Sequence, residues 1–157
     1  MNVSSLFKIY ENVISSKLIN ENIEPQNTRV HKILQFEVSL GELASSVSSH
    51  AYNANSICKK DSDLILTKYV QCMLSLTQLG FDYNYTDLDI ITIANIDPEV
   101  SISSQFLTLY IDITDLIVAP CRDHYITLFE DLLTIAHLLD FSENVICEKF
   151  SELYSAK

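Results

Sequence analysis

The sequence predicts an all-α protein, an antiparallel helical bundle of five to six helices. Only two Gly and three Pro occur in 157 residues, and so few helix breakers favour long helices over a hairpin-rich sheet. Apolar residues recur at steps of three and four over several long stretches, which is the period of a helix with one buried face. A content of 48% apolar and 20% charged residues is ordinary for a globular protein. We therefore expect a single helical domain over residues 1–157.

The apolar period and its interruptions divide the chain into helices and connections. Pro25, Pro98 and Pro120 mark interruptions, because proline cannot continue a helix. The predicted helices cover residues 3–19, 29–52, 63–79, 101–118, 122–139 and 143–154.

The predicted helix over residues 29–52 is the longest, and its apolar positions indicate one buried stripe. Asp61 or Ser62 is expected to cap the next helix, and Gly80 to end it in the left-handed conformation. Because only a short polar loop joins these two helices, we expect them to pack antiparallel. The stripe of the long helix comprises Val30, Ile33, Leu34, Val38, Leu40, Leu43, Ala44 and Val47.

The second half of the chain is expected to hold three helices after a connection. Residues 81–100 lack a sustained period, and we interpret them as a connection with a short helical or extended piece near residues 88–93. Ser103 or Ser104 is expected to cap the helix over residues 101–118. The apolar positions of that helix are Phe106, Leu107, Tyr110, Ile113, Leu116 and Ile117. The inward positions of the following helix are Tyr125, Ile126, Phe129, Leu132, Leu133 and Ala136.

Charge and cysteine usage exclude several classes of function. Ten Lys and Arg oppose 21 Asp and Glu, and a net charge of −11 repels nucleic acid and anionic membranes. No apolar run approaches a membrane span of about 18 residues, and the first residues lack the pattern of a signal peptide. The four Cys do not have zinc-site spacing, so we expect reduced thiols in a cytoplasmic protein that binds neither nucleic acid nor membrane.

Two segments carry a resemblance to a known family. The segment LGELASSV, followed by KYVQCMLSLTQLG, resembles the dimeric all-α dUTPases, relatives of MazG and other all-α nucleoside-triphosphate pyrophosphatases. The later segments QFLTLYIDITDLI and IAHLLDFSENVICEKFSELY are similar to the last helices of that family. The resemblance implies a homodimer. It also implies Glu-x-x-Glu on one helix and Glu-x-x-Asp on the next, holding Mg²⁺ ions that bind the triphosphate and polarise a water.

This chain departs from the family pattern at three of those four positions. The resemblance places them at Ser39, Glu42, Lys68 and Gln71, and only Glu42 is a carboxylate. We therefore expect no metal and no other cofactor, and an ion pair between Glu42 and Lys68 in the place of the metal ions. The resulting hypothesis is a catalytically inactive dUTPase-like homologue that acts as a binding, regulatory or interaction protein, as a homodimer or with a protein partner.

Two alternatives remain open. One is an active, Mg²⁺-dependent dUTP or nucleoside-triphosphate pyrophosphatase with a rearranged site. The other is an unrelated helical interaction protein of bacterial or phage origin. The candidate ligand-binding residues are Tyr52, His50 and Tyr83, which could stack on or bind a base.

Overall fold

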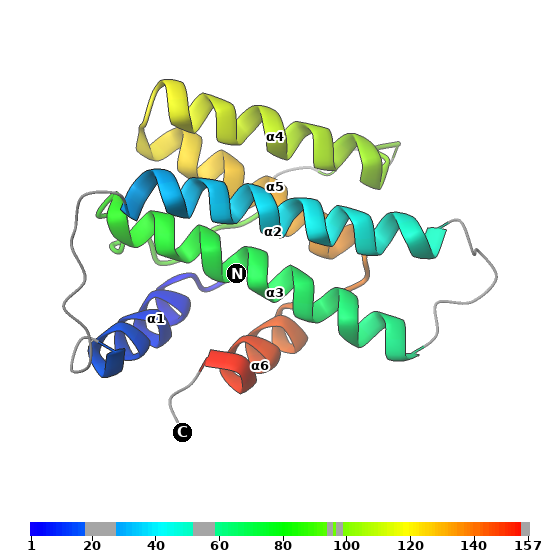
Figure 1. Ribbon diagram of the computed structural model, residues 1–157, viewed down its shortest axis with the longest axis horizontal. Coiled ribbons are helices and arrows are strands. Elements are labelled where there is room, and N and C mark those ends of the chain that lie inside the picture. The colour runs from blue at the N-terminus through cyan, green and yellow to red at the C-terminus, as the bar shows by residue number, and fades with distance from the viewer. Residues whose placement is uncertain (18–27, 52–58, 94–95, 97–98, 155–157) are drawn as a thin grey trace.

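The computed structural model describes residues 1–17, 28–51, 59–93, 96 and 99–154, and it confirms the all-α prediction. The helices are α1 (Ser4–Lys17), α2 (Thr28–Ala51), α3 (Lys59–Asp82), α4 (Ile102–Val118), α5 (Arg122–Leu138) and α6 (Glu143–Tyr154). Figure 1 shows α2 and α3 side by side and antiparallel, with α4 above this pair, α5 behind it and α1 and α6 below it.

The core is built around α3, which packs against α1, α2, α5 and α6. Two buried tyrosines connect α3 to α5 through hydrogen bonds to backbone carbonyls. Tyr69 Oη donates to the carbonyl of Leu132 at 3.1 Å, and Tyr125 Oη donates to the carbonyl of Leu76 at 3.1 Å. Because a buried hydroxyl without a partner is costly, these bonds fix how the two helices face each other.

The ends of α3 differ from the prediction for residues 63–79. The helix begins at Lys59, so Asp61 and Ser62 lie inside it rather than at its cap, and it ends at Asp82. Asn84, with φ 59°, supplies the left-handed residue that we had expected from Gly80. The amide of Tyr85 donates to the carbonyl of Gly80 and that of Asn84 to the carbonyl of Phe81, which together form a Schellman motif.

A Schellman motif also ends α5, and its left-handed residue is Asp140 rather than a glycine. Asp140 has φ 62°, and the amide of Phe141 donates to the carbonyl of Ala136 at 2.9 Å. At the start of α4 the cap is Ser101, whose hydroxyl accepts the amide of Ser104 at 3.1 Å. The expectation of Ser103 or Ser104 was therefore wrong, because the helix begins at Ile102 and both serines lie within its first turn.

Of the two forms expected near residues 88–93, a short helical or an extended piece, the connection after α3 contains the extended one. The amide of Val3 donates to the carbonyl of Asp89 at 2.9 Å, and that of Ile91 to the carbonyl of Met1 at 3.0 Å. A single antiparallel bridge joins Asn2 to Ile90. This pairing holds the first residues of the chain beside α6 and α5.

The predicted apolar stripes of α2 and α4 are only partly buried. Phe36, Leu40, Leu43 and Val47 form the buried face of α2, whereas Val30, Leu34 and Val38 are exposed. On α4, Leu107, Tyr110 and Ile117 are exposed. These residues lie at helical spacing but on faces that turn away from the core, so a three-to-four residue period alone did not separate them from core positions.

Two carboxyl groups meet between α4 and α5. The Asp131 carboxylate accepts a hydrogen bond from the buried Gln105 amide at 2.6 Å, and the Asp112 carboxyl, whose Oδ2 is buried, lies beside Asp131, to which it can donate a bond only when it is protonated. Burial, the bond to Asp131 and the negative charges of Asp131 and Asp115 raise the pKa of Asp112 to about 7. Asp112 therefore holds a proton in the folded chain at pH values where an ordinary aspartate is ionised.

Across the described residues, no helix has both the length and the apolar character that a membrane crossing demands.

A first prediction concerns the close approach of α5 and α1 to α3 at Gly80. A Cβ at this position would overlap Tyr125 Oη, and it would lie 2.9 Å from Phe7 Cζ. Gly80→Ala should therefore destabilise the fold by about 1–3 kcal/mol, measured by urea unfolding. Gly41→Ala is the matched control, since its Cβ would lie 3.4 Å from Tyr110 Oη and alanine favours a helix. A Gly80→Ala protein as stable as the control would refute this packing.

A second prediction concerns the proton on Asp112. The folded pKa of about 7 exceeds the unfolded value near 3.8, so this group's stabilising contribution is full below about pH 4 and is lost as the pH rises to about 7. Asp112→Asn keeps a hydrogen-bond donor without a charge. When the pH is raised from 5 to 8, the unfolding free energy of the variant should increase by about 1–2 kcal/mol relative to that of the parent. This figure is already reduced for solvent screening. If the two proteins differ in unfolding free energy by the same amount at pH 5 and at pH 8, the raised pKa of Asp112 is contradicted.

Candidate functional site

The antiparallel pair α2 and α3 brings together the four positions at which the family resemblance places metal ligands. Ser39 and Glu42 lie three residues apart on α2, and Lys68 and Gln71 lie three residues apart on α3, so each pair shares one helix face. Lys68 Nζ lies 2.6 Å from Glu42 Oε2. The expected ion pair between the two helices is therefore present, with the Glu42 side chain 51% exposed and that of Lys68 27% exposed.

Serine hydroxyls occupy the rest of this contact. Ser39 Oγ donates to the carbonyl of Gln35 at 2.9 Å and lies 3.5 Å from Ser75 Oγ. Ser75 is buried, and its hydroxyl donates to the carbonyl of Gln71 at 3.2 Å. Sequence reasoning did not single out Ser75, although it lies one helical turn beyond Gln71. The two hydroxyls let the helices approach closely and bond mainly to their own backbones.

A buried thiol lies beneath the ion pair. Cys72 is fully buried, and burial, together with the nearby Glu42 carboxylate, raises the pKa of its thiol far above the ordinary value, while Lys68 acts in the opposite direction. A thiol held in its neutral form is a poor nucleophile and a poor metal ligand. Cys72 is therefore a packing residue.

These four side chains do not fit a pair of magnesium ions. Mg²⁺ needs near-octahedral coordination by hard oxygen ligands, usually including carboxylates. The four side chains offer one carboxylate, which an ammonium group already contacts at 2.6 Å. Within the described part of the chain, no group of three or more His, Cys, Asp or Glu side chains is placed to hold a metal ion.

The structure does not bring Tyr83 to this site. Tyr83 follows α3, where its ring stacks on Tyr85 with centroids 5.6 Å apart and lies 4.4 Å from the Arg29 guanidinium carbon. Lys32 Nζ contacts Asp82 Oδ1 at 2.7 Å in the same region. Since Glu42 lies ten residues beyond Lys32, this cluster is about 15 Å away along α2. The side chain of His50, and Tyr52 as a whole, lie outside the described residues.

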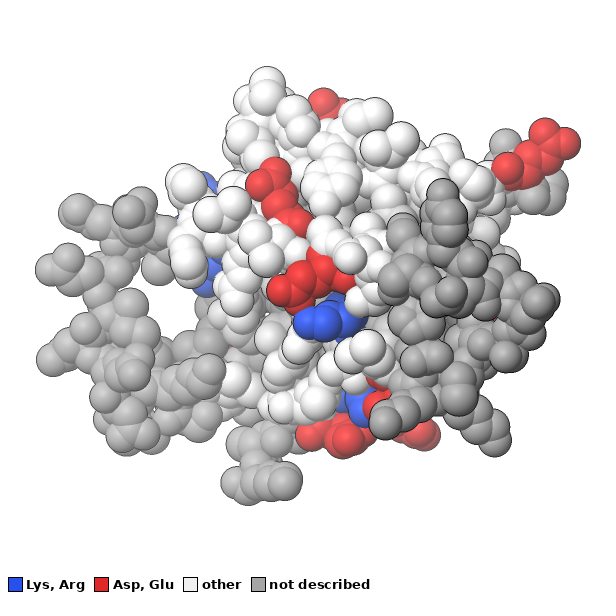
Figure 2. Space-filling model, turned by 45° about the vertical axis from the view of Figure 1, so that its right-hand side comes forward, with Lys and Arg blue, Asp and Glu red and all other residues white. Residues whose placement is uncertain are grey.

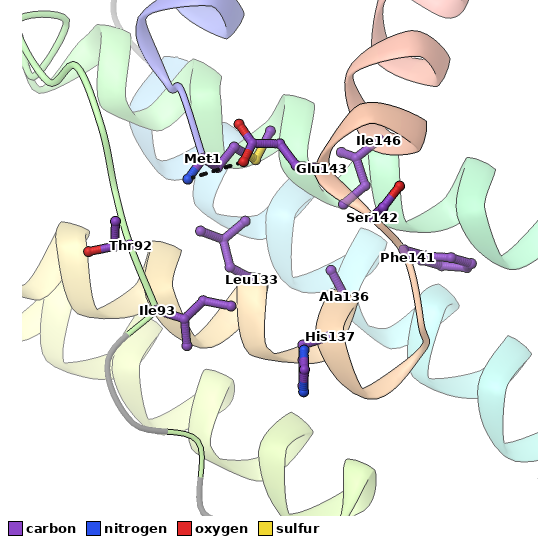
Figure 3. Close-up of a pocket in the computed structure, with 10 residues that line it drawn as sticks. All are labelled: Met1, Thr92, Ile93, Leu133, Ala136, His137, Phe141, Ser142, Glu143 and Ile146. Carbon is purple, nitrogen blue, oxygen red and sulfur yellow. Dashed lines mark ion pairs between the residues drawn. The ribbon is translucent and has the colours of Figure 1, made fainter.

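A separate cavity of about 380 Å³ opens between the first residues, α5 and α6. Figure 3 shows Leu133 and Ala136 on one side of it, with Met1 and Glu143 opposite Ile93. The Met1 ammonium donates to the carbonyl of Ile91 at 2.6 Å and lies 3.6 Å from Glu143 Oε2. Most of the residues that line the cavity are apolar, and the Glu143 carboxylate is already paired with the Met1 ammonium group.

Comparison with known proteins identifies the family. A search of curated proteins and a search of solved structures both returned no significant match. A family model described as dUTPase matches residues 4–155, which is nearly the whole chain and includes both helices of the site. The chain therefore belongs to the dUTPase family.

Proposed function

We propose that this chain is a dUTPase-family homologue that does not hydrolyse dUTP and instead serves as a binding or regulatory protein. The observation that supports this most directly is the Lys68–Glu42 contact of 2.6 Å. It occupies the place where the family resemblance expects carboxylates that hold Mg²⁺.

The argument is one of charge. The family pattern supplies four carboxylates around its metal ions, whereas Ser39, Glu42, Lys68 and Gln71 together carry one negative and one positive charge. A cation entering this site would have to displace the Lys68 ammonium from Glu42 and would then gain a single anionic ligand. Without the metal ions, these four side chains have no net positive charge to offset a triphosphate, because Glu42 already balances Lys68, and they include no Lewis acid to polarise a water for attack on phosphorus.

The proposed activity is therefore recognition rather than chemistry. The excess of acidic residues works against anionic ligands, including nucleic acid and a triphosphate without its metal ions. A protein partner with a basic surface fits this charge better. We also propose a homodimer, on the separate ground that the family resemblance implies one.

A third prediction tests the absence of turnover. With dUTP and either Mg²⁺ or Mn²⁺, the purified chain should release no pyrophosphate above the background without protein. Turnover that is lost in Glu42→Gln would overturn the proposal, because it would assign chemistry to this site. A melting temperature that rises only when Mg²⁺ and a non-hydrolysable dUTP analogue are both present would favour the alternative of a rearranged active site.

A variant with restored carboxylates provides the control. Ser39→Glu, Lys68→Glu and Gln71→Asp, combined in one protein, place four carboxylates on the two facing helices. Their mutual repulsion should lower the melting temperature without metal, and Mg²⁺ should raise it again. The parent chain should show no such response to Mg²⁺. A parent chain that responds as the variant does would contradict the proposed loss of the metal site.

A further inference from the structure

The extended segment after α3 has one edge that is paired and one that is open. On the paired edge, Asp89 and Ile91 bond to the first three residues of the chain through their backbone groups. Because backbone groups of alternate residues in a strand point to opposite edges, those of Ile90 and Thr92 point away from this pairing. Within the described part of the chain, the amide and carbonyl groups of these two residues have no hydrogen-bond partner.

Side chains along the same segment alternate as those of a strand do. Ile91 is 3% exposed and Ile93 packs against the core, whereas Ile90 is 67% exposed and Thr92 is exposed. Figure 3 shows Thr92 and Ile93 on opposite sides of the segment, with Ile93 directed toward Leu133. One face of the segment is thus fixed to the core, and the other presents a large apolar side chain to solvent.

An open strand edge of this kind is a template for another strand. Unpaired N–H and C=O groups invite main-chain hydrogen bonds from a second chain, and natural proteins usually protect them with lysine, proline or a covering element. Here the two outward residues are Ile90 and Thr92, which are types that favour strands. An added strand would satisfy the backbone groups of both residues and cover the Ile90 side chain.

Charge indicates which kind of strand fits this edge. Asp89 is exposed, and its carboxylate has no ion-pair partner among the described residues. It shares a cavity of about 340 Å³ with Lys8 and Glu11, so two acidic groups face one basic group there. Figure 2 shows, on one face of the molecule, basic side chains that lie against acidic ones near the centre and at the lower edge. Acidic charge is therefore in excess, and basic side chains on the added strand complement it.

We propose that residues 89–92 bind an extended segment of a protein partner, which adds a strand to the open edge and carries basic side chains. The inference rests on the proposed function, whose partner has a basic surface, and it names where that partner docks. A second copy of the chain fits this edge less well, because each copy carries −11 and the two repel one another.

A fourth prediction tests the edge with a synthetic probe, an end-capped octapeptide of alternating valine and lysine. At millimolar peptide, hydrogen exchange of the Ile90 and Thr92 amides in the full chain should slow at least tenfold, measured by NMR. The same peptide N-methylated at every residue keeps its charges and side chains but cannot donate main-chain hydrogen bonds. It should leave both amides unprotected, because strand addition depends on those bonds.

Two substitutions at Thr92 provide a matched pair. Thr92→Pro removes the amide that faces the open edge and disrupts no existing bond, and proline is tolerated on edge strands. Thr92→Val keeps that amide and a β-branched side chain. Both variants should retain the helical circular dichroism of the parent. Thr92→Pro should weaken peptide binding at least tenfold, measured at Ile90, whereas Thr92→Val should bind as the parent does.

The outcomes separate this inference from the proposed function. Amides of Ile90 and Thr92 that stay unprotected at millimolar peptide would overturn the inference, as would equal protection by the N-methylated peptide, which would indicate attraction by charge alone. Protection that grows with protein concentration in the absence of peptide would assign the edge to a second copy and would also overturn it. Turnover of dUTP is measured independently, so an active chain that binds the peptide would defeat the proposed function alone. An inactive chain without protection would defeat this inference alone.

Discussion

The burial of α3 is the constraint on which the rest of this structure depends. Four other helices pack against it, and the hydrogen bonds of Tyr69 and Tyr125 set how α5 lies across it. One flank of α3 remains partly open, and that flank carries Lys68 and Gln71 opposite α2. The packing decides where these side chains lie, whereas their chemical identity decides what the site can do.

Fold and chemistry are therefore separable in this chain. A partly exposed ion pair such as Lys68–Glu42 contributes at most about 1 kcal/mol to stability, so the bundle does not depend on it. The same pair changes the chemistry of the site completely, because it sets an ammonium where the family resemblance expects an anion. A scaffold can be retained in this way while its charges are replaced.

The sequence predicted the parts of this account that depend on spacing. Long apolar periods predicted the helices. The family resemblance, which placed Glu42 and Lys68 at metal positions on two facing helices, predicted the ion pair between them.

Features that depend on what lies opposite a residue were not predictable in this way. Gly80 had the pattern of a helix terminus, yet it admits the Tyr125 ring inside α3. The same limit applies on α2, because Leu34 has helical spacing whether it faces a core or solvent. Asp112 lies beside Asp131 because of the register of α4 against α5. Residue types alone do not predict that register.

The most direct measurement of the central claim is a crystal structure of the chain grown with Mn²⁺ and a non-hydrolysable dUTP analogue, with anomalous scattering used to locate the metal. The account predicts Lys68 Nζ against the Glu42 carboxylate and no anomalous peak between α2 and α3. Two Mn²⁺ ions bound beside Glu42, with Lys68 turned away, would contradict it.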